Sequence, residues 1–153
     1  MRVLLQRIAT AWVEWEGEAT ERVGPGLLGL VGFRRDDAGA LCEPMAEKMV
    51  HLRIFEDARG RMNRSLLEVG GGLVLVPQFT LVADCRQGRR PGFSAALEPG
   101  AARAHFEAFV AACRARLPGV VTGRFGAHMR VHLVNDGPVT ILLDSDELGL
   151  VQG

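Results

Sequence analysis

Apolar and polar positions alternate near the start of the chain and then give way to short runs that are apolar throughout. The alternation over residues 3–8 and 11–15 predicts two strands, each with one buried face. The runs at residues 27–33 and 73–76 are rich in Leu and Val and too short for helices, so they predict strands buried on both faces. The second run ends at Pro77, which lacks an N–H, and the polar residues that follow make this strand end a candidate place for a site.

Two longer stretches repeat their apolar positions with the period of an α-helix. The first predicts a helix over residues 37–52 with Asp36 or Asp37 as its N-cap, and its methionines are expected in the core rather than in a ligand set. The second predicts a helix that begins at Pro99 and is stopped by residues 118–119. The two apolar stripes are Leu41, Met45, Met49 and Leu52, and then Ala102, Phe106, Phe109, Val110, Cys113 and Leu117.

The last third of the chain returns to short strands. Residues 120–122, 129–134 and 139–143 predict three closing strands, with residues 135–138 as the turn between the last two. Many short strands joined by tight turns, together with two main helices, predict an α/β fold whose sheet is mixed and mostly antiparallel rather than doubly wound. Residues 1–153 are expected to form a single domain, in which residues 145–153 are a short C-terminal tail.

Composition predicts where the protein is located and argues against a membrane protein. The chain has 153 residues, of which 48% are hydrophobic and 24% charged, as in ordinary globular domains. Its apolar runs fall far short of the ~18 residues that span a bilayer, so no membrane partner is expected. Cys42, Cys85 and Cys113 are widely spaced and odd in number, which predicts reduced thiols in a cytoplasmic protein.

Charge is distributed unevenly although the formal net charge is zero. Residues 85–130 hold eight arginines against two acidic residues, and residues 84–96, which are rich in Gly and Arg, predict a long surface loop. A basic middle on a neutral chain favours a local anionic partner such as phosphate or RNA. The alternative is that the arginines reflect the nucleotide composition of the genome.

Side chains with a known catalytic spacing are missing. The four histidines form no HExxH or Cys/His pattern, and there is no nucleophile elbow, P-loop or dinucleotide fingerprint, so neither a metal nor a cofactor is expected. Thr80 is a candidate nucleophile, but its hydroxyl needs an adjacent base and none is evident. Two kinds of catalytic group remain, namely backbone N–H groups at the broken strand end and groups that the substrate itself supplies.

The dipeptide Gly137-Pro138 is the other unusual element, and it has two interpretations. It is a simple turn, or it contains an X-Pro bond in the cis form, which costs only about 0.5–1 kcal/mol. In the cis form the carbonyls of the two residues can point the same way. Two rigid main-chain carbonyls would then measure the chirality of a bound substrate.

Several segments, in a consistent order, resemble the D-aminoacyl-tRNA deacylase family, also called D-tyrosyl-tRNA deacylases. Residues 77–81 resemble its Ser-Gln-Phe-Thr-Leu motif, and residues 135–140 resemble its Gly-cisPro motif. Residues 90–93 resemble Arg-Pro-Ser-Phe, and residues 122–125 with Met129 resemble Thr-Gly-Arg-Phe. Residues 5–7 and 53–63 also fit, so the resemblance extends from residue 1 to about residue 144.

The resemblance implies a homodimer with a three-layer β/β/α fold that acts on aminoacyl-tRNA and not on DNA. It would hydrolyse the ester between a D-amino acid and the tRNA 3′ end, with assistance from the ribose 2′-hydroxyl of the substrate. The amides of Phe79 and Thr80 would hold the scissile carbonyl. Gly137-Pro138, inserted from the partner subunit, would face the α-carbon and exclude L side chains.

Further roles follow from the same resemblance. Gln78 and Arg7 would order the site, Pro77 would belong to the substrate-binding residues, and Phe125 and Met129 would line a pocket for the terminal adenine. Steric exclusion of L side chains cannot reject glycine, so some activity on glycyl-tRNA is also expected.

Two positions depart from the family motifs. Pro77 replaces a Ser, with the loss of a hydroxyl and an N–H, and Gly92 replaces a Ser in the loop. A related group of deacylases has Pro at the first motif position and a relaxed chirality gauge, so a relaxed-specificity deacylase of mischarged L- or glycyl-tRNA is one alternative. A non-catalytic module that binds the 3′ end of RNA is another.

Overall fold

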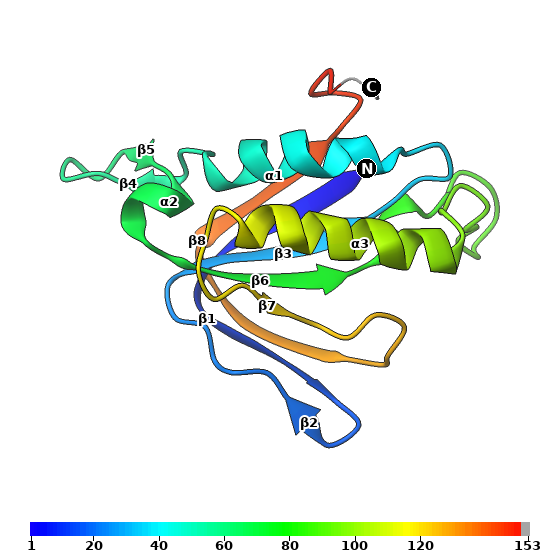
Figure 1. Ribbon diagram of the computed structural model, residues 1–153, viewed down its shortest axis with the longest axis horizontal. Helices are drawn as coiled ribbons and strands as arrows, with labels where there is room; N and C mark the ends of the chain where they lie inside the picture. The colour runs from blue at the N-terminus through cyan, green and yellow to red at the C-terminus, as the bar shows by residue number, and fades with distance from the viewer. Residues whose placement is uncertain (151–153) are drawn as a thin grey trace.

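One curled sheet organises residues 1–150, which are the residues described by the computed structural model (Figure 1). Its strand order is β2-β1-β3-β6-β7, and β8 pairs with β1. β1 is antiparallel to its three partners, whereas β3 with β6 and β6 with β7 are parallel, so the mixed sheet is confirmed. β4 and β5 form a separate hairpin. The elements are β1 (Arg2–Trp15), β2 (Glu18–Ala19), β3 (Gly26–Gly32), α1 (Cys42–Val50), β4 (Phe55–Glu56), β5 (Met62–Arg64), α2 (Leu66–Val69), β6 (Gly72–Pro77), α3 (Pro99–Arg114), β7 (Val121–Thr122) and β8 (Arg130–Asp144).

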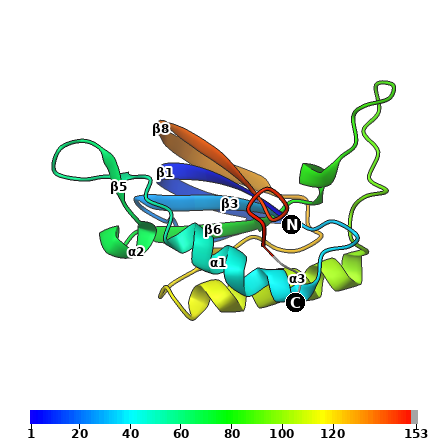
Figure 2. The ribbon, with the colours of Figure 1, turned by 90° about the horizontal axis from the view of Figure 1, so that it is seen from above.

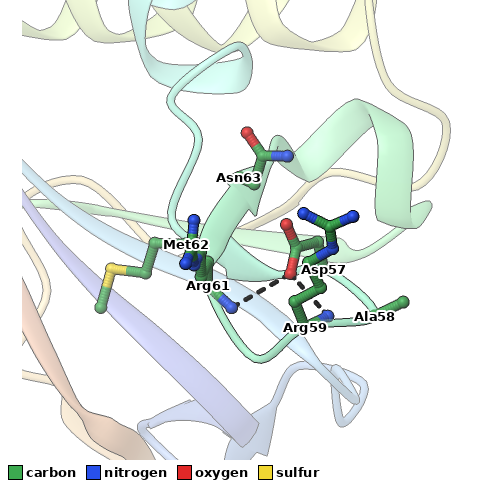
Figure 3. A pocket seen from close by; sticks show the side chains of 6 residues that line it. All are labelled: Asp57, Ala58, Arg59, Arg61, Met62 and Asn63. Carbon is green, nitrogen blue, oxygen red and sulfur yellow. Dashed lines mark hydrogen bonds between the residues drawn. The ribbon is translucent and has the colours of Figure 1, made fainter.

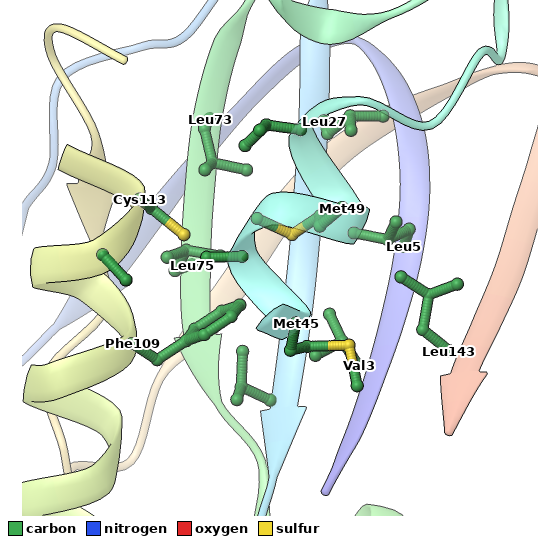
Figure 4. Close-up of a cluster of buried hydrophobic side chains, with 14 of the residues drawn as sticks. Val3, Leu5, Leu27, Met45, Met49, Leu73, Leu75, Phe109, Cys113 and Leu143 are labelled. Atoms are coloured by element: carbon green, nitrogen blue, oxygen red, sulfur yellow. The ribbon is translucent and has the colours of Figure 1, made fainter. Parts of the chain in front are cut away.

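Alternate residues of the central strands enter two different cores. Leu73 and Leu75 of β6 belong to the core shared with α1 and α3, where Met45, Met49 and Phe109 are fully buried (Figure 4). The next residues along β6 belong to a second core on the opposite face, because successive side chains of a strand point to opposite sides. This second core contains Ile8, Ala11, Val13, Val23, Leu28, Val74 and Val76.

The two cores explain the layers of the fold. Both main helices lie on one face of the sheet (Figure 2), and the second half of β1 with the first half of β8 curls over the other face. Helices, central strands and folded-over strands therefore make the three β/β/α layers that were expected. The two apolar runs are buried on both faces, as the sequence predicted.

Two pairs of predicted strands are in fact single strands. β1 is continuous from residue 2 to residue 15, with irregular register against β8 between Gln6 and Thr10. β8 is also continuous, so the prediction of a turn at residues 135–138 is wrong. Asn135 pairs with Ile8 and Thr140 with Gln6, so that only Arg7 of β1 lies opposite residues 136–139 of β8. Residues that are typical of a turn form a bulge here, because both flanks pair with the same neighbouring strand.

The helix boundaries also differ from the prediction. α1 begins at Cys42, after a 3₁₀ turn, and the Asp37 carboxylate does not cap it, since it accepts hydrogen bonds from the amino group of Met1 (2.6 Å) and from the Arg34 amide. α3 begins at Pro99 as predicted but already ends at Arg114. None of the helices within residues 1–150 is long and apolar enough to cross a membrane.

The predicted C-terminal tail is partly visible in the structure. Its first residues turn back onto the molecule, and Leu148 and Leu150 pack against the larger core. Residues 151–153 of the tail lie outside the described residues.

Candidate functional site

The end of β6 is fixed by backbone hydrogen bonds. Pro77 is the last residue paired with β3, and the Gln78 amide donates to the Val31 carbonyl (2.7 Å) one position further on. The chain then winds into a 3₁₀ turn, Phe79–Val82. The amide of Gln78 thus continues the contact with β3 although Pro77 has no N–H and no hydroxyl.

Two backbone amides at this strand end donate no hydrogen bond among the described residues. The first N–H groups of a helical turn have no partner within the turn. Those of Phe79 and Thr80 donate to no other group among residues 1–150, whereas the Leu81 amide donates to the Gln78 carbonyl (3.3 Å). Adjacent backbone amides without partners can bind an anion or a developing oxyanion.

A cleft of about 630 Å³ opens beside these amides. Phe79 is 58% exposed and packs edge to face against Phe93, with ring centroids 5.0 Å apart. Apolar side chains dominate the lining, which suits a flat aromatic ligand group. The lining includes Pro77, Gln78 and Phe79 from the strand end, Phe93, Pro99 and Ala102 from the loop and α3, and Phe125, His128 and Met129 from the segment before β8.

Gly123 brings the segment before β8 close to the strand end. Its amide donates to the Leu75 carbonyl (2.8 Å), and a Cβ at this position would lie 2.8 Å from the sulfur of Met129 and 3.6 Å from Pro77. Any larger residue would displace the side chain of Met129. The predicted residues Phe125 and Met129 consequently lie in the same cleft as Pro77.

Thr80 stands beside the cleft without lining it. Its hydroxyl accepts a hydrogen bond from the side-chain amide of Gln78, and this is the one hydrogen bond of that hydroxyl among the described residues. An amide nitrogen is not a base, so the hydroxyl lacks the partner that a nucleophile requires.

The bulge of β8 is fixed by side chains. Arg7 is only 7% exposed, and it donates from Nε to the Asp136 carbonyl (3.1 Å) and from Nη1 to the Ile54 carbonyl (2.8 Å). Asn135 accepts from the Val139 amide (3.1 Å) across the bulge. Together these two side chains satisfy backbone groups that the interrupted ladder leaves unpaired.

Gly137 has a conformation that is restricted to glycine. Its φ is +133°, and a Cβ at this position would lie 2.7 Å from a methyl group of Val139 and 3.2 Å from Nη2 of Arg7. The peptide bond to Pro138 is cis. Both residues are exposed, so this edge of the bulge faces away from the protein.

The predicted site residues thus fall into two groups within one chain. Pro77, Gln78, Phe79, Phe125 and Met129 surround the cleft, whereas Arg7, Gly137 and Pro138 meet at the bulge and do not line it. Sequence reasoning missed the roles of Phe93 and Asn135 as individual residues, although both stand inside motifs that it used.

The long loop after the 3₁₀ turn folds back on itself. Asp84 and Gly92 exchange two backbone hydrogen bonds of 2.8 Å, and the loop between them projects from the body of the protein (Figure 2). Hydrogen bonds from Arg86 hold the pKa of the Asp84 carboxyl far below its usual range. The charge of Arg86 is therefore already paired.

A second hollow, of about 470 Å³, lies in the hairpin of β4 and β5 (Figure 3). The Asp57 carboxylate shapes it by accepting hydrogen bonds from the amides of Arg59 (2.8 Å) and Arg61 (3.1 Å). None of the predicted site residues lines it, and its hydrogen bonds are those of a tight turn.

Comparison with known proteins points to one family. Residues 4–144 match the family model described as D-Tyr-tRNA(Tyr) deacylase. A D-aminoacyl-tRNA deacylase of Azotobacter vinelandii is 53% identical over 145 residues, which cover 95% of this chain and 100% of that relative. A D-aminoacyl-tRNA deacylase of Thermomicrobium roseum is 55% identical over 148 residues, or 97% of this chain and 96% of that relative.

Solved structures share the fold of this chain. A c-Myc DNA unwinding element binding protein is similar with a TM-score of 0.89 and 33% identity, over 95% of this chain and 99% of that one. A probable eukaryotic D-amino acid tRNA deacylase is similar in fold, with a TM-score of 0.81 and 20% identity, over 93% of this chain and 97% of that one. The chain belongs to the D-Tyr-tRNA(Tyr) deacylase family, whose members are hydrolases of the ester bond of aminoacyl-tRNA.

Proposed function

We propose that this protein hydrolyses D-aminoacyl-tRNA at the end of β6, with the amides of Phe79 and Thr80 as the oxyanion donors. The observation that carries the proposal is that these two N–H groups have no partner among the described residues and stand beside the cleft. The carbonyl oxygen of the ester gains negative charge when water attacks the carbon. Fixed backbone donors stabilise that charge without reorganisation, and each is worth about 3 kcal/mol of barrier.

The proton transfers fall to the substrate in this proposal. Thr80 has no base beside it, so the ribose 2′-hydroxyl next to the ester is the nearest group that can direct the attacking water. The bond between the acyl carbon and the 3′-oxygen then breaks, the oxygen takes up the proton, and the products are a free amino acid and tRNA. Gln78, bonded to Thr80, holds the turn that carries the two amides.

The cleft would hold the end of the tRNA. We assign its apolar part, with Phe125 and Met129, to the terminal adenine, and Pro77 to the floor beside the ester. The flat faces of a purine match such a lining. The proposal places this reaction in the cytoplasm, treats the chain as a single domain, and requires neither a metal nor another cofactor.

Selection of the D-enantiomer would come from a second copy of the chain. Gly137 and Pro138 lie on an exposed bulge outside the cleft of their own chain, so they are free to enter the cleft of the partner subunit in a homodimer. Main chain placed against the α-carbon leaves no space for an L side chain. It cannot reject glycine, so glycyl-tRNA would also be hydrolysed.

Hydrolysis of D-tyrosyl-, L-tyrosyl- and glycyl-tRNA, measured side by side with and without EDTA, tests the proposal. We expect loss of the D-tyrosyl and glycyl esters, no loss of the L-tyrosyl ester, and no effect of the chelator. Loss of both tyrosyl esters would instead indicate a relaxed-specificity deacylase, and Pro77 would then be the first residue to replace by Ser. Binding of tRNA without hydrolysis would indicate a non-catalytic module that binds the 3′ end of RNA.

A further inference from the structure

Arg103 lies on α3 at the rim of the cleft. It follows Ala102, which lines the cleft, and its guanidinium carbon stands over the ring of Phe125, 5.2 Å from the ring centroid. Phe125 lines the cleft as well. The face of an aromatic ring attracts a cation, so Phe125 holds the charge of Arg103 next to the opening.

No acidic side chain in the described part of the chain neutralises this arginine. No carboxylate among residues 1–150 comes within 4.0 Å of it, although Glu107 is four residues further along the same helix. Arg86 and Arg116, in contrast, are each bonded to carboxylates. Arg103 is also exposed, so its charge remains available to a bound anion.

The N-terminus of α3 cannot take that anion instead. Glu98 caps the helix, and its carboxylate accepts hydrogen bonds from the amides of Gly100 (2.9 Å) and Ala101 (3.1 Å). These bonds lower the pKa of Glu98, which keeps it charged at neutral pH. An anion at this end of the cleft therefore needs a cationic side chain.

We propose that Arg103 binds the phosphate that links the terminal nucleoside of the substrate to the preceding nucleotide. The inference rests on the proposed function, in which the terminal adenine lies against Phe125. The 5′-phosphate of that nucleoside is the closest anion to the base along an RNA 3′ end. A guanidinium group presents paired N–H donors that match two phosphate oxygens, and Phe125 holds it in place beforehand.

Two small esters isolate this contact. One is 3′-O-(D-tyrosyl)adenosine, and the other is the same ester with a 5′-monophosphate. We expect the wild type to have a lower KM for the phosphorylated ester. Arg103→Ala should raise that KM about tenfold, which is the loss typical of one charge-assisted hydrogen-bonded contact, and should leave kcat and the KM of the adenosine ester unchanged. The KM of Arg103→Lys for the phosphorylated ester should lie between those of the wild type and Arg103→Ala.

Arg59→Ala is the matched control, because Arg59 is exposed, has no carboxylate partner among the described residues, and lies on the β4–β5 hairpin. It should leave both KM values unchanged. A wild type that treats the two esters alike, or an Arg103→Ala variant that changes both KM values equally or neither, overturns the role of Arg103. Failure of the proposed function is distinguishable, since the wild type would then not hydrolyse D-tyrosyl-tRNA itself.

Discussion

The end of β6 and the bulge of β8 both interrupt a strand, but they are held in opposite ways. At the end of β6, the Gln78 amide bonds to the backbone of β3, and the side chain of Phe79 is largely exposed. At the bulge, the side chains of Arg7 and Asn135 bond to the backbone. This difference indicates where a substitution acts. The first region presents backbone groups and is anchored to β3 by a backbone hydrogen bond, whereas the bulge depends on the side chains of Arg7 and Asn135 for its shape.

The largest effect should come from removing one backbone donor at the end of β6. Phe79→Pro deletes an N–H at the first position of a helical turn, where proline is sterically tolerated. We expect kcat for D-tyrosyl-tRNA to fall by about 100- to 1,000-fold. Phe79→Ala keeps the N–H and should lose at most about tenfold, so equal losses in the two variants would remove the amide from the mechanism.

Gly137→Ala tests the bulge itself. The added methyl group would lie 2.7 Å from Val139 at a φ of +133°, so the bulge must deform at a cost of about 1–3 kcal/mol. We expect about a 100-fold loss of D-tyrosyl-tRNA hydrolysis. Gly119→Ala, at a φ of +70° with no atom within 4 Å of the new Cβ, should cost a similar free energy of unfolding without loss of activity.

Arg7→Ala tests whether side chains hold the bulge. It leaves the Asp136 and Ile54 carbonyls without their donor, and we expect about 2–3 kcal/mol of lost stability and about a tenfold loss of activity. Denaturant unfolding measures the loss of stability, and single-turnover assays measure the loss of activity. Arg86→Ala, which breaks an exposed ion pair with Asp84, should leave the free energy of unfolding almost unchanged, because solvent screens such a pair.

Stability at the far end of β8 is expected to respond to pH. Burial of Asp144 raises its pKa, but hydrogen bonds from Arg34 and Arg2 outweigh this and lower the pKa from 3.8 to about 2. The carboxylate therefore stabilises the fold above pH 4, and about 2 kcal/mol is lost as the pH falls from 4 to 2. Asp144→Asn should remove that pH dependence in urea unfolding, and an unchanged profile would assign it to other groups.

Thr80→Val should have the smallest effect. The variant keeps the backbone amide and the branched shape and loses the hydroxyl that accepts from Gln78. We expect hydrolysis to stay within about threefold of the wild type, because this hydroxyl has no base beside it. A loss of hydrolysis of 100-fold or more in a correctly folded Thr80→Val variant would indicate that Thr80 is a nucleophile.

Local sequence patterns located most of the helices and strands, because such elements depend on residues that are neighbours in the chain. The run that becomes β6 is apolar at every position, and the structure buries it between two cores. The motif around Pro77 likewise marked the strand end that borders the cleft. The prediction of a turn at Asn135 to Pro138 was wrong, because the same residue types occur in tight turns and in bulges. Only the pairing of both flanks with β1 decides between the two.

The sequence by itself determined the two main helices, the buried runs and the residues at both interrupted strands, since periodicity and motif order are properties of the chain. Tertiary structure alone decided that Phe125 and Met129 meet Pro77 across Gly123, and that Arg7 reaches the bulge. It also left the amides of Phe79 and Thr80 without partners among residues 1–150. The contacts at the cleft and at the bulge join residues far apart in the chain. Their geometry depends on how the sheet curls, and no local pattern specifies that.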